Sequence, residues 1–134
     1  MSLRSCDVFA PPRRPRGRPE RAIQNAIIQH LRLRGALVAV TDAGAAYRAG
    51  AFFGDAVPAG WPDITGVLPD GRFIGVEVKS ATGRQSDAQK HMEQNIRRRN
   101  GLYVLARSVD DVENVLAKTA RTTKSAETKA TTTT

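Results

Sequence analysis

The sequence has one cysteine and no apolar stretch long enough to cross a bilayer. Cys6 cannot close a disulfide within the chain and has no cysteine or histidine neighbours at metal-ligand spacing, which argues against a disulfide framework and a structural zinc site. No apolar run approaches the roughly 20 residues of a transmembrane helix, and the N-terminus lacks the apolar segment of a secretory signal. We therefore expect a protein without a membrane partner, in the reducing cytoplasm of a bacterial or phage-infected cell.

Negative charge is also in short supply. The chain has 13 acidic residues against 21 lysines and arginines, which gives a formal net charge of +8 and a pI of about 10.6. The field of such a surface attracts polyanions, and nucleic acid is the leading candidate partner. A basic protein that is merely soluble is the alternative that charge alone leaves open.

Both ends of the chain are poor in apolar residues. Residues 1–19 form an arm rich in proline and arginine, and residues 119–134 form a tail rich in threonine and lysine. Neither segment can bury enough apolar surface to offset the entropy lost on folding, so we expect both to be disordered. The remaining residues, 20–118, have the length of one compact domain and contain no internal repeat.

Apolar periodicity divides this domain into helices and strands. The first helix has apolar residues at the three and four spacing of one face, namely Ile23, Ala26, Ile27 and Leu31. The predicted elements are, in order, a helix over 20–34, a buried strand over 36–41, hairpin strands over 64–68 and 72–79, a helix over 86–100, a strand over 102–106, and a short helix opened by Ser108 with Val109, Val112, Val115 and Leu116 on its inner face. The order αβββαβα predicts an α/β fold with a central mixed sheet flanked by helices.

Candidate chemistry is concentrated around the predicted hairpin, whose reversal is Pro69-Asp70-Gly71. Asp63 precedes the first strand and Glu77 lies on the second, so paired strands bring the two carboxylates together. The period of two along a strand makes Glu77 and Lys79 point to the same side. Two carboxylates and a backbone carbonyl, that of Val78, provide the hard oxygen ligands that Mg²⁺ or Mn²⁺ prefers.

Lys79 would act beside this metal site. It can orient or deprotonate an attacking water, or it can stabilise negative charge on a phosphorus atom. The alternative for Glu77 and Lys79 is a solvated strand face with an ion pair of little consequence. The pattern of Pro-Asp before a hairpin, Glu-Val-Lys on its second strand, and then a helix and another apolar strand favours the active-site interpretation.

These residues resemble the VRR-NUC group of PD-(D/E)XK nucleases over roughly Glu20 to Ala117. The resemblance rests on Glu20 with Ile23-Gln24, on Gly60-Trp61-Pro62-Asp63-Ile64, on Phe73-Ile74-Gly75-Val76-Glu77-Val78-Lys79, and on Ser86 with Gln89. It implies a restriction-endonuclease-like core, Mg²⁺ or Mn²⁺ as cofactor, hydrolysis of DNA phosphodiester bonds, and often action on branched or structured DNA, in some members as a homodimer resembling Holliday-junction resolvases. Trp61 departs from the small or flexible residue expected before Pro-Asp, which bears on substrate preference.

Two accessory residues have both functional and structural interpretations. Glu20 lies on the core-facing stripe of the first helix, where a metal would compensate its charge, but it also suits the positive end of the helix dipole. Gln89 could contact metal-bound water, Lys79 or DNA, but with Ser86 it also forms a capping box. We expect Asp63, Glu77, Lys79, Glu20 and Gln89 to be catalytic, and Asp63, Glu77, Val78 and Glu20 to be metal ligands.

Basic residues outside this site suggest contacts to DNA. Pro15-Arg16-Gly17-Arg18-Pro19 resembles the core of an AT-hook, in which arginines enter a narrow minor groove; a basic tether that neutralises phosphates is the alternative. Arg97, Arg98 and Arg99 either bind a phosphate backbone or serve only the helix dipole. The mixture of aromatics and charge at Tyr47, Arg48, Phe52, Phe53 and Trp61 fits stacking on unpaired bases, or core and dimer contacts.

Three functions are therefore compared. The first is a metal-dependent endonuclease for branched or structured DNA in replication, recombination or repair, needing no small-molecule cofactor beyond the metal. The second is a non-catalytic DNA-binding protein on the same fold, which the intact Asp63, Glu77 and Lys79 set disfavours. The third is a restriction-type endonuclease, which would need a sequence-reading segment that is not evident in this chain.

Overall fold

The fold is described by a computed structural model of residues 19–41 and 57–130, with side chains as far as residue 125. Its elements are, in chain order, α1 (Pro19–Leu33), β1 (Leu37–Val40), β2 (Ile64–Val67), β3 (Phe73–Val78), α3 (Asp87–Arg98), β4 (Leu102–Ala106) and α4 (Val109–Ala130). Within these ranges the order αβββαβα is confirmed, and the predicted boundaries lie within two residues of the observed ones except at the end of α4.

The four strands form one mixed sheet in the order β1-β2-β3-β4. The pairs β1-β2 and β2-β3 are antiparallel, whereas β3 and β4 are parallel, with Glu77 opposite Leu105. The parallel pair requires a crossover connection, which α3 supplies. The order therefore puts β3, the strand of the predicted active site, in the interior of the sheet.

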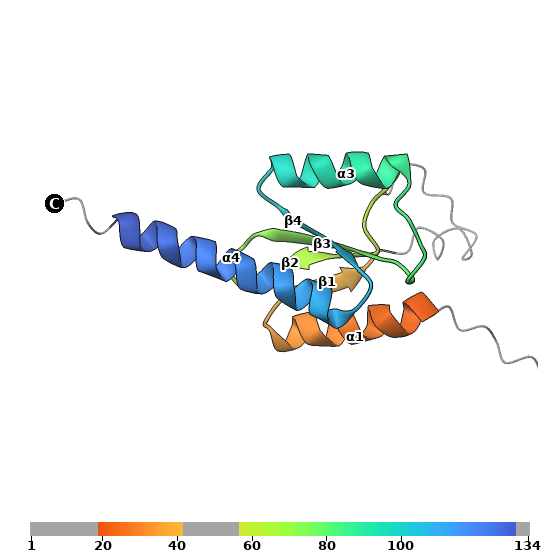
Figure 1. Cartoon of the computed structure of the whole chain (residues 1–134), viewed down its shortest axis with the longest axis horizontal. Helices are drawn as coiled ribbons and strands as arrows, with labels where there is room; N and C mark the ends of the chain where they lie inside the picture. The colour runs from red at the N-terminus through yellow and green to blue at the C-terminus, as the bar shows by residue number, and fades with distance from the viewer. Residues whose placement is uncertain (1–18, 42–56, 131–134) are drawn as a thin grey trace, which may run out of the picture.

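The helices cover the sheet from two sides (Figure 1). Helices α1 and α4 lie together against one face, and α3 lies on the other. The period of two along β3 turns Ile74, Val76 and Val78 toward α1 and α4, where they are buried. This layer holds the main core, which consists of Ile27, Ile28, Leu31, Ala36, Ile64, Leu68, Ile74, Val76, Val78, Val104, Ala106 and Val112.

The predicted helical faces are largely confirmed. In α4, Val112 is buried, and Val109, Val115 and Leu116 pack against the core, as expected. In α1 the buried stripe includes Ile28 in place of Ala26, which is exposed. This change follows from the position of α4, which packs beside α1 and widens the face of α1 that is covered.

Strand β1 is an edge strand, which corrects the prediction of a buried strand over residues 36–41. Leu37 is 79% exposed and Val40 is 47% exposed, and only Val38 packs against the core. A run of apolar residues matches a strand covered on both faces, but burial depends on which elements lie over it. Of the described helices, only α1 is in substantial contact with β1.

Helix α4 continues to Ala130, which corrects the prediction of a short helix followed by a disordered tail from residue 119. Its first half is fixed by packing, and each further residue then adds a backbone hydrogen bond without a new nucleation cost. The hydroxyls of Thr119, Thr122 and Thr123 donate to carbonyls four residues earlier, so these polar side chains are satisfied inside the helix. The C-terminal half projects beyond the sheet in Figure 1.

Other predictions concern residues outside the described ranges. The arm over residues 1–18 lies there, as do residues 42–56 and 131–134. Pro19 is the first residue of α1, so the predicted arm ends one residue earlier than expected. No helix in the described part of the chain is both long and apolar enough to cross a membrane.

Two glycines fix the approach of the chain to the active-site strand. Gly60 has a φ of +79°, and a Cβ there would lie 2.3 Å from the carbonyl oxygen of Ala88 in the first turn of α3. Gly75 lies under Pro62, and its Cβ would lie 2.7 Å from the Pro62 ring. The segment that leads into Asp63 is thus pressed against both α3 and β3, at distances that only glycine permits.

We expect Gly60→Ala to destabilise the fold far more than Gly71→Ala. Gly71, in the hairpin turn, also has a positive φ, of +89°, but has nothing within 4 Å of the added Cβ. Both substitutions incur backbone strain of about 1–2 kcal/mol, and only Gly60→Ala adds overpacking, which typically costs about 1–3 kcal/mol. Urea unfolding of the two variants measures the difference. Equal losses in the free energy of unfolding would show that α3 accommodates the added methyl group without cost.

Candidate active site

The predicted active-site residues come from several segments of the chain that meet at one end of β3. Asp63 stands just before β2, and Thr41 donates its backbone N–H to the Asp63 carbonyl at 2.8 Å, which holds this position beside β1. Glu77 lies near the end of β3, on the face opposite the main core. Gln89 lies in the first turn of α3 and reaches across to it.

Among the residues that the structure describes, Glu77 is the one buried charged side chain, with an exposure of 2%. Its Oε1 accepts a hydrogen bond from Gln89 Nε2 at 2.6 Å and lies 3.1 Å from Lys79 Nζ. Lys79 and Glu77 therefore point the same way, as the strand period predicts. Glu77 Oε2 is also buried but has no hydrogen-bond partner among the described residues. A buried oxygen without a partner is costly, which sets this carboxylate apart from a solvated strand face.

Burial and a neighbouring negative charge make the proton of Glu77 hard to lose. Removal from water is the largest effect, the charge of Asp63 adds to it, and Lys79 opposes both; together they raise the pKa of Glu77 to about 7. The pKa of Asp63 is raised as well. Burial raises its pKa, while the N–H of Val78, which donates to Asp63 Oδ2 at 2.9 Å, and the charge of Lys79 lower it.

Gln89 forms the capping box that the sequence predicts, and its side-chain amide also donates to Glu77, whereas its predicted contact with metal-bound water, Lys79 or DNA stays a prediction. Its Oε1 accepts from the backbone N–H of Ser86 at 2.8 Å, while Ser86 Oγ accepts from the backbone N–H of Gln89 at 3.2 Å, which completes the capping box. Its Nε2 is then directed at Glu77. The cap thus fixes one end of the amide so that the other end donates to the buried carboxylate.

Glu20 also lies beside the site. Its Oε1 accepts from the backbone N–H of Ser80 at 3.3 Å, and its charge contributes to the raised pKa of Asp63. Among the described residues, no group of three or more His, Cys, Asp or Glu side chains could hold a metal ion. Glu20 is therefore near the two carboxylates without forming a three-carboxylate cluster with them, and its role as a ligand stays a prediction.

The donors at this site nevertheless fit a hard divalent cation. Asp63 and Glu77 are two carboxylates in a half-buried to buried setting, with raised pKa values and with one Glu77 oxygen unpartnered. Mg²⁺ characteristically takes one or two protein carboxylates and fills its remaining positions with water and phosphate oxygens. A cation would compensate both the buried charge and the repulsion between the carboxylates.

Comparisons with known proteins identify the family of this chain. The sequence model of the VRR-NUC domain matches residues 18–110, which include every active-site residue described above. The chain belongs to the VRR-NUC domain family. That family is part of the PD-(D/E)XK superfamily of nucleases and is generally metal-dependent, as the sequence resemblance indicated.

Two solved structures share the fold of this VRR-NUC chain. One, titled VRR_NUC domain, is 20% identical with a TM-score of 0.57 and covers 74% of this chain and 95% of its own. The other, titled VRR_NUC domain protein, is 18% identical with a TM-score of 0.51 and covers 73% of this chain and 84% of its own. No curated protein sequence matches this chain closely enough to be counted as a relative.

Sequence reasoning missed the buried residues behind the VRR-NUC site. Tyr103 on β4 is 1% exposed, and its hydroxyl accepts from Gln85 Nε2 at 3.2 Å. Burial, with the charges of Glu77, Glu93 and Asp63, raises its pKa to about 12. A tyrosine within a run of apolar residues was the available signal, because a buried hydroxyl requires a partner. Tyr103 thus stays neutral and adds no charge beside the carboxylates.

The arginines predicted to contact DNA do not gather in one stretch of the sequence. Arg97 binds Glu93 at 2.9 Å and the carbonyl of Tyr103 at 3.2 Å, so one of the five arginines predicted to contact DNA has a structural role. Arg98 and Arg99 are exposed at the end of α3, where they suit the helix dipole as well as a phosphate. Arg16 and Arg18 lie outside the described residues, as do Tyr47, Arg48, Phe52 and Phe53.

His30 has a structural role between α1 and α4. It pairs with Glu113 at 2.6 Å, and Arg34 pairs with the same carboxylate, so the contact joins α1 to α4. This cluster lies on elements that form the main core. It holds the helical layer together and contributes no group to the VRR-NUC site.

The raised pKa of Glu77 predicts how stability depends on pH. In the folded chain Glu77 keeps its proton up to about pH 7, whereas the unfolded chain loses it near 4.5. The stability from this group is therefore fully present below pH 4.5 and is lost as pH rises through 7. In EDTA, the melting temperature should fall by several degrees across this window, and Glu77→Gln should flatten the fall. An equally steep fall in the variant would contradict the assignment.

The two bonds of the Gln89 amide can be separated by substitution. Ser86→Ala removes the hydroxyl of the cap, which typically costs about 1 kcal/mol of stability, but leaves Gln89 Nε2 facing Glu77. Gln89→Ala removes both functions. If the VRR-NUC site cleaves DNA, Gln89→Ala should lower the cleavage rate at least tenfold more than Ser86→Ala. Equal cleavage rates in two folded variants would show that Gln89 acts only as a capping residue.

Proposed function

We propose that this VRR-NUC chain is a Mg²⁺- or Mn²⁺-dependent endonuclease that hydrolyses phosphodiester bonds of branched or structured DNA. The observation that carries the proposal is the buried Glu77 carboxylate: Lys79 and Gln89 approach its Oε1, Asp63 stands near enough to raise its pKa, and its Oε2 has no hydrogen-bond partner among the described residues. An arrangement this costly to folding is typical of a catalytic site, because charge is desolvated there in advance of the reaction.

Each residue has a distinct role in this proposal. Asp63, Glu77 and the carbonyl of Val78 would hold the cation, and Glu20 would stand beside them. When bound, the cation supplies a Lewis acid for the phosphate and lowers the pKa of a coordinated water. Gln89 keeps the Glu77 carboxylate in one orientation. These residues would thus place the scissile phosphate against the exposed side of the site.

Lys79 is the cation that the chain itself contributes. Its ammonium lies 3.1 Å from Glu77 Oε1, and its side chain is 18% exposed, so it borders both the buried carboxylate and solvent. In this position it would balance the negative charge that gathers on the phosphorus during attack. Acting on the attacking water is the second role open to it.

Cleavage assays test the proposal directly. Wild-type protein should cut DNA in Mg²⁺ or Mn²⁺ but not in EDTA, and Lys79→Ala should lower the rate about 10²- to 10³-fold while leaving binding nearly intact. Lys90→Ala is the matched control, because Lys90 on α3 is 60% exposed and its removal also costs one positive charge. The control should cut as fast as wild type.

Other outcomes of these assays would favour a different function. Tight DNA binding without cutting in either metal would favour the non-catalytic DNA-binding function. Cutting of linear duplex at one short sequence would favour a restriction-type enzyme. Preference for flaps or four-way junctions would support the branched substrate proposed here.

The homodimer belongs to the same proposal. Symmetric cutting of a four-way junction needs two active sites, and one described surface suits a second copy. Leu37 on the edge strand β1 and its neighbour Val67 on β2 are 79% and 45% exposed, and edge strands pair readily with other chains. Paired nicks within one junction would support a dimer, and single nicks would oppose it.

A further inference from the structure

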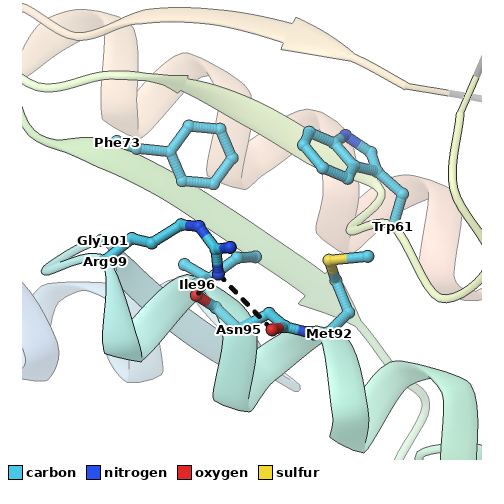
Figure 2. A pocket seen from close by; sticks show the side chains of 7 residues that line it. All are labelled: Trp61, Phe73, Met92, Asn95, Ile96, Arg99 and Gly101. Carbon is cyan, nitrogen blue, oxygen red and sulfur yellow. Dashed lines mark hydrogen bonds between the residues drawn. The ribbon is translucent and has the colours of Figure 1, made fainter.

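A cavity lies beside the candidate active site, between α3 and the sheet (Figure 2). Its volume is about 500 Å³, within the range of roughly 300–1,000 Å³ that is usual for small-ligand sites. The side chains that line it are Trp61, Phe73, Met92, Asn95, Ile96 and Arg99, and the backbone of Gly101 completes the wall. None of these residues belongs to the catalytic set proposed above.

The cavity and the active site are built on the same three segments. Trp61 stands two residues before Asp63, Phe73 is four residues before Glu77 on the same face of β3, and Met92 follows Gln89 by three residues on α3. Four residues of strand span about 13 Å, and three residues of helix rise about 4.5 Å. Neighbouring phosphates of one DNA strand are about 3.4 Å apart along a duplex, so the cavity lies within about four nucleotides of the site.

The lining combines aromatic rings with flexible apolar side chains. The rings of Trp61 and Phe73 meet edge to face, with centroids 5.9 Å apart and an interplanar angle of 63°. In Figure 2 they stand on the sheet side, and Met92 and Ile96 reach toward them from α3. Such a surface suits a flat, apolar ring, and methionine adapts to its outline.

A fixed cation stands at the same cavity. Arg99 Nη1 donates to the carbonyl of Asn95 at 3.0 Å and lies 3.4 Å from Asn95 Oδ1, and the guanidinium lies between α3 and the Phe73 ring (Figure 2). Arg98, the next residue toward the start of α3, is also exposed. An apolar slot with cations beside it complements a base that hangs from a phosphate backbone.

From these observations we infer that the cavity between Trp61, Phe73 and α3 binds an unpaired nucleobase of the DNA on which the neighbouring site acts. A base in an intact duplex is stacked and paired, so it cannot enter a cavity without first leaving the helix. The cavity would therefore select DNA with unpaired nucleotides near the scissile bond. This inference rests on the proposed function in that DNA is taken as the ligand.

Trp61 is the only tryptophan of the chain, so tryptophan fluorescence reports on this one residue of the cavity wall. The probes are a fully paired duplex, the same duplex with a short single-stranded tail, and that tail with abasic sites in place of its bases. Binding is measured in EDTA, where metal-dependent cutting does not occur. We expect the tail with bases to bind about 5- to 100-fold more tightly than the abasic tail and to change Trp61 emission.

Variants separate the cavity from general charge attraction. Trp61→Leu, with binding followed by anisotropy of labelled DNA, should abolish the preference for bases over abasic sites. Arg99→Gln should weaken binding to the base-containing tail more than Arg98→Gln, although both remove one exposed arginine from the same turn of α3. The arginine pair keeps the test informative if Trp61→Leu fails to fold, which circular dichroism would reveal.

The outcomes distinguish this inference from the proposed nuclease. Equal affinity for base-containing and abasic tails, or Trp61 emission that does not respond to bound DNA, would overturn the base-binding cavity even if the protein cuts DNA. A preference for bases that depends on Trp61 would support the cavity even if no cutting is found, because the binding assay requires no catalysis.

Discussion

The arrangement of side chains at the candidate active site depends on the burial of one carboxylate, that of Glu77. A buried carboxylate is costly to ionise unless neighbouring groups compensate its charge, so the positions of its neighbours matter. Lys79 and Gln89 both approach Glu77 Oε1, and Asp63 stands close enough to raise the pKa of Glu77. Two cations, one from the chain and one from solution, would make this cluster of acids stable.

Several features of the backbone serve this burial. Gly60 and Gly75 remove the side chains that would keep the Trp61-Pro62-Asp63 segment away from α3 and β3. The capping box at the start of α3 fixes the Gln89 amide, so a device for helix stability also orients an active-site donor. Preorganisation of this kind is what electrostatic catalysis requires, because the donors are already in place before charge develops.

The same segments that form the site also form the cavity beside it. Trp61, Phe73 and Met92 extend from the catalytic elements, so substrate selection and chemistry would share one rigid support. The family to which the chain belongs accounts for the first layer of this design, the nuclease-type core. Trp61, which lines the aromatic cavity, stands where a small or flexible residue is expected before Pro-Asp.

The sequence by itself determined the order of elements and the partnership of Asp63, Glu77 and Lys79, because these follow from local periodicity and from the geometry of a hairpin. Tertiary structure alone decided the rest. The exposure of β1, which carries Leu37, depends on which helix lies over it, and the length of α4 depends on the packed half that nucleates it. The burial of Glu77, the partner of Tyr103 and the cavity are set by distances between segments far apart in the chain, which no local pattern of residues encodes.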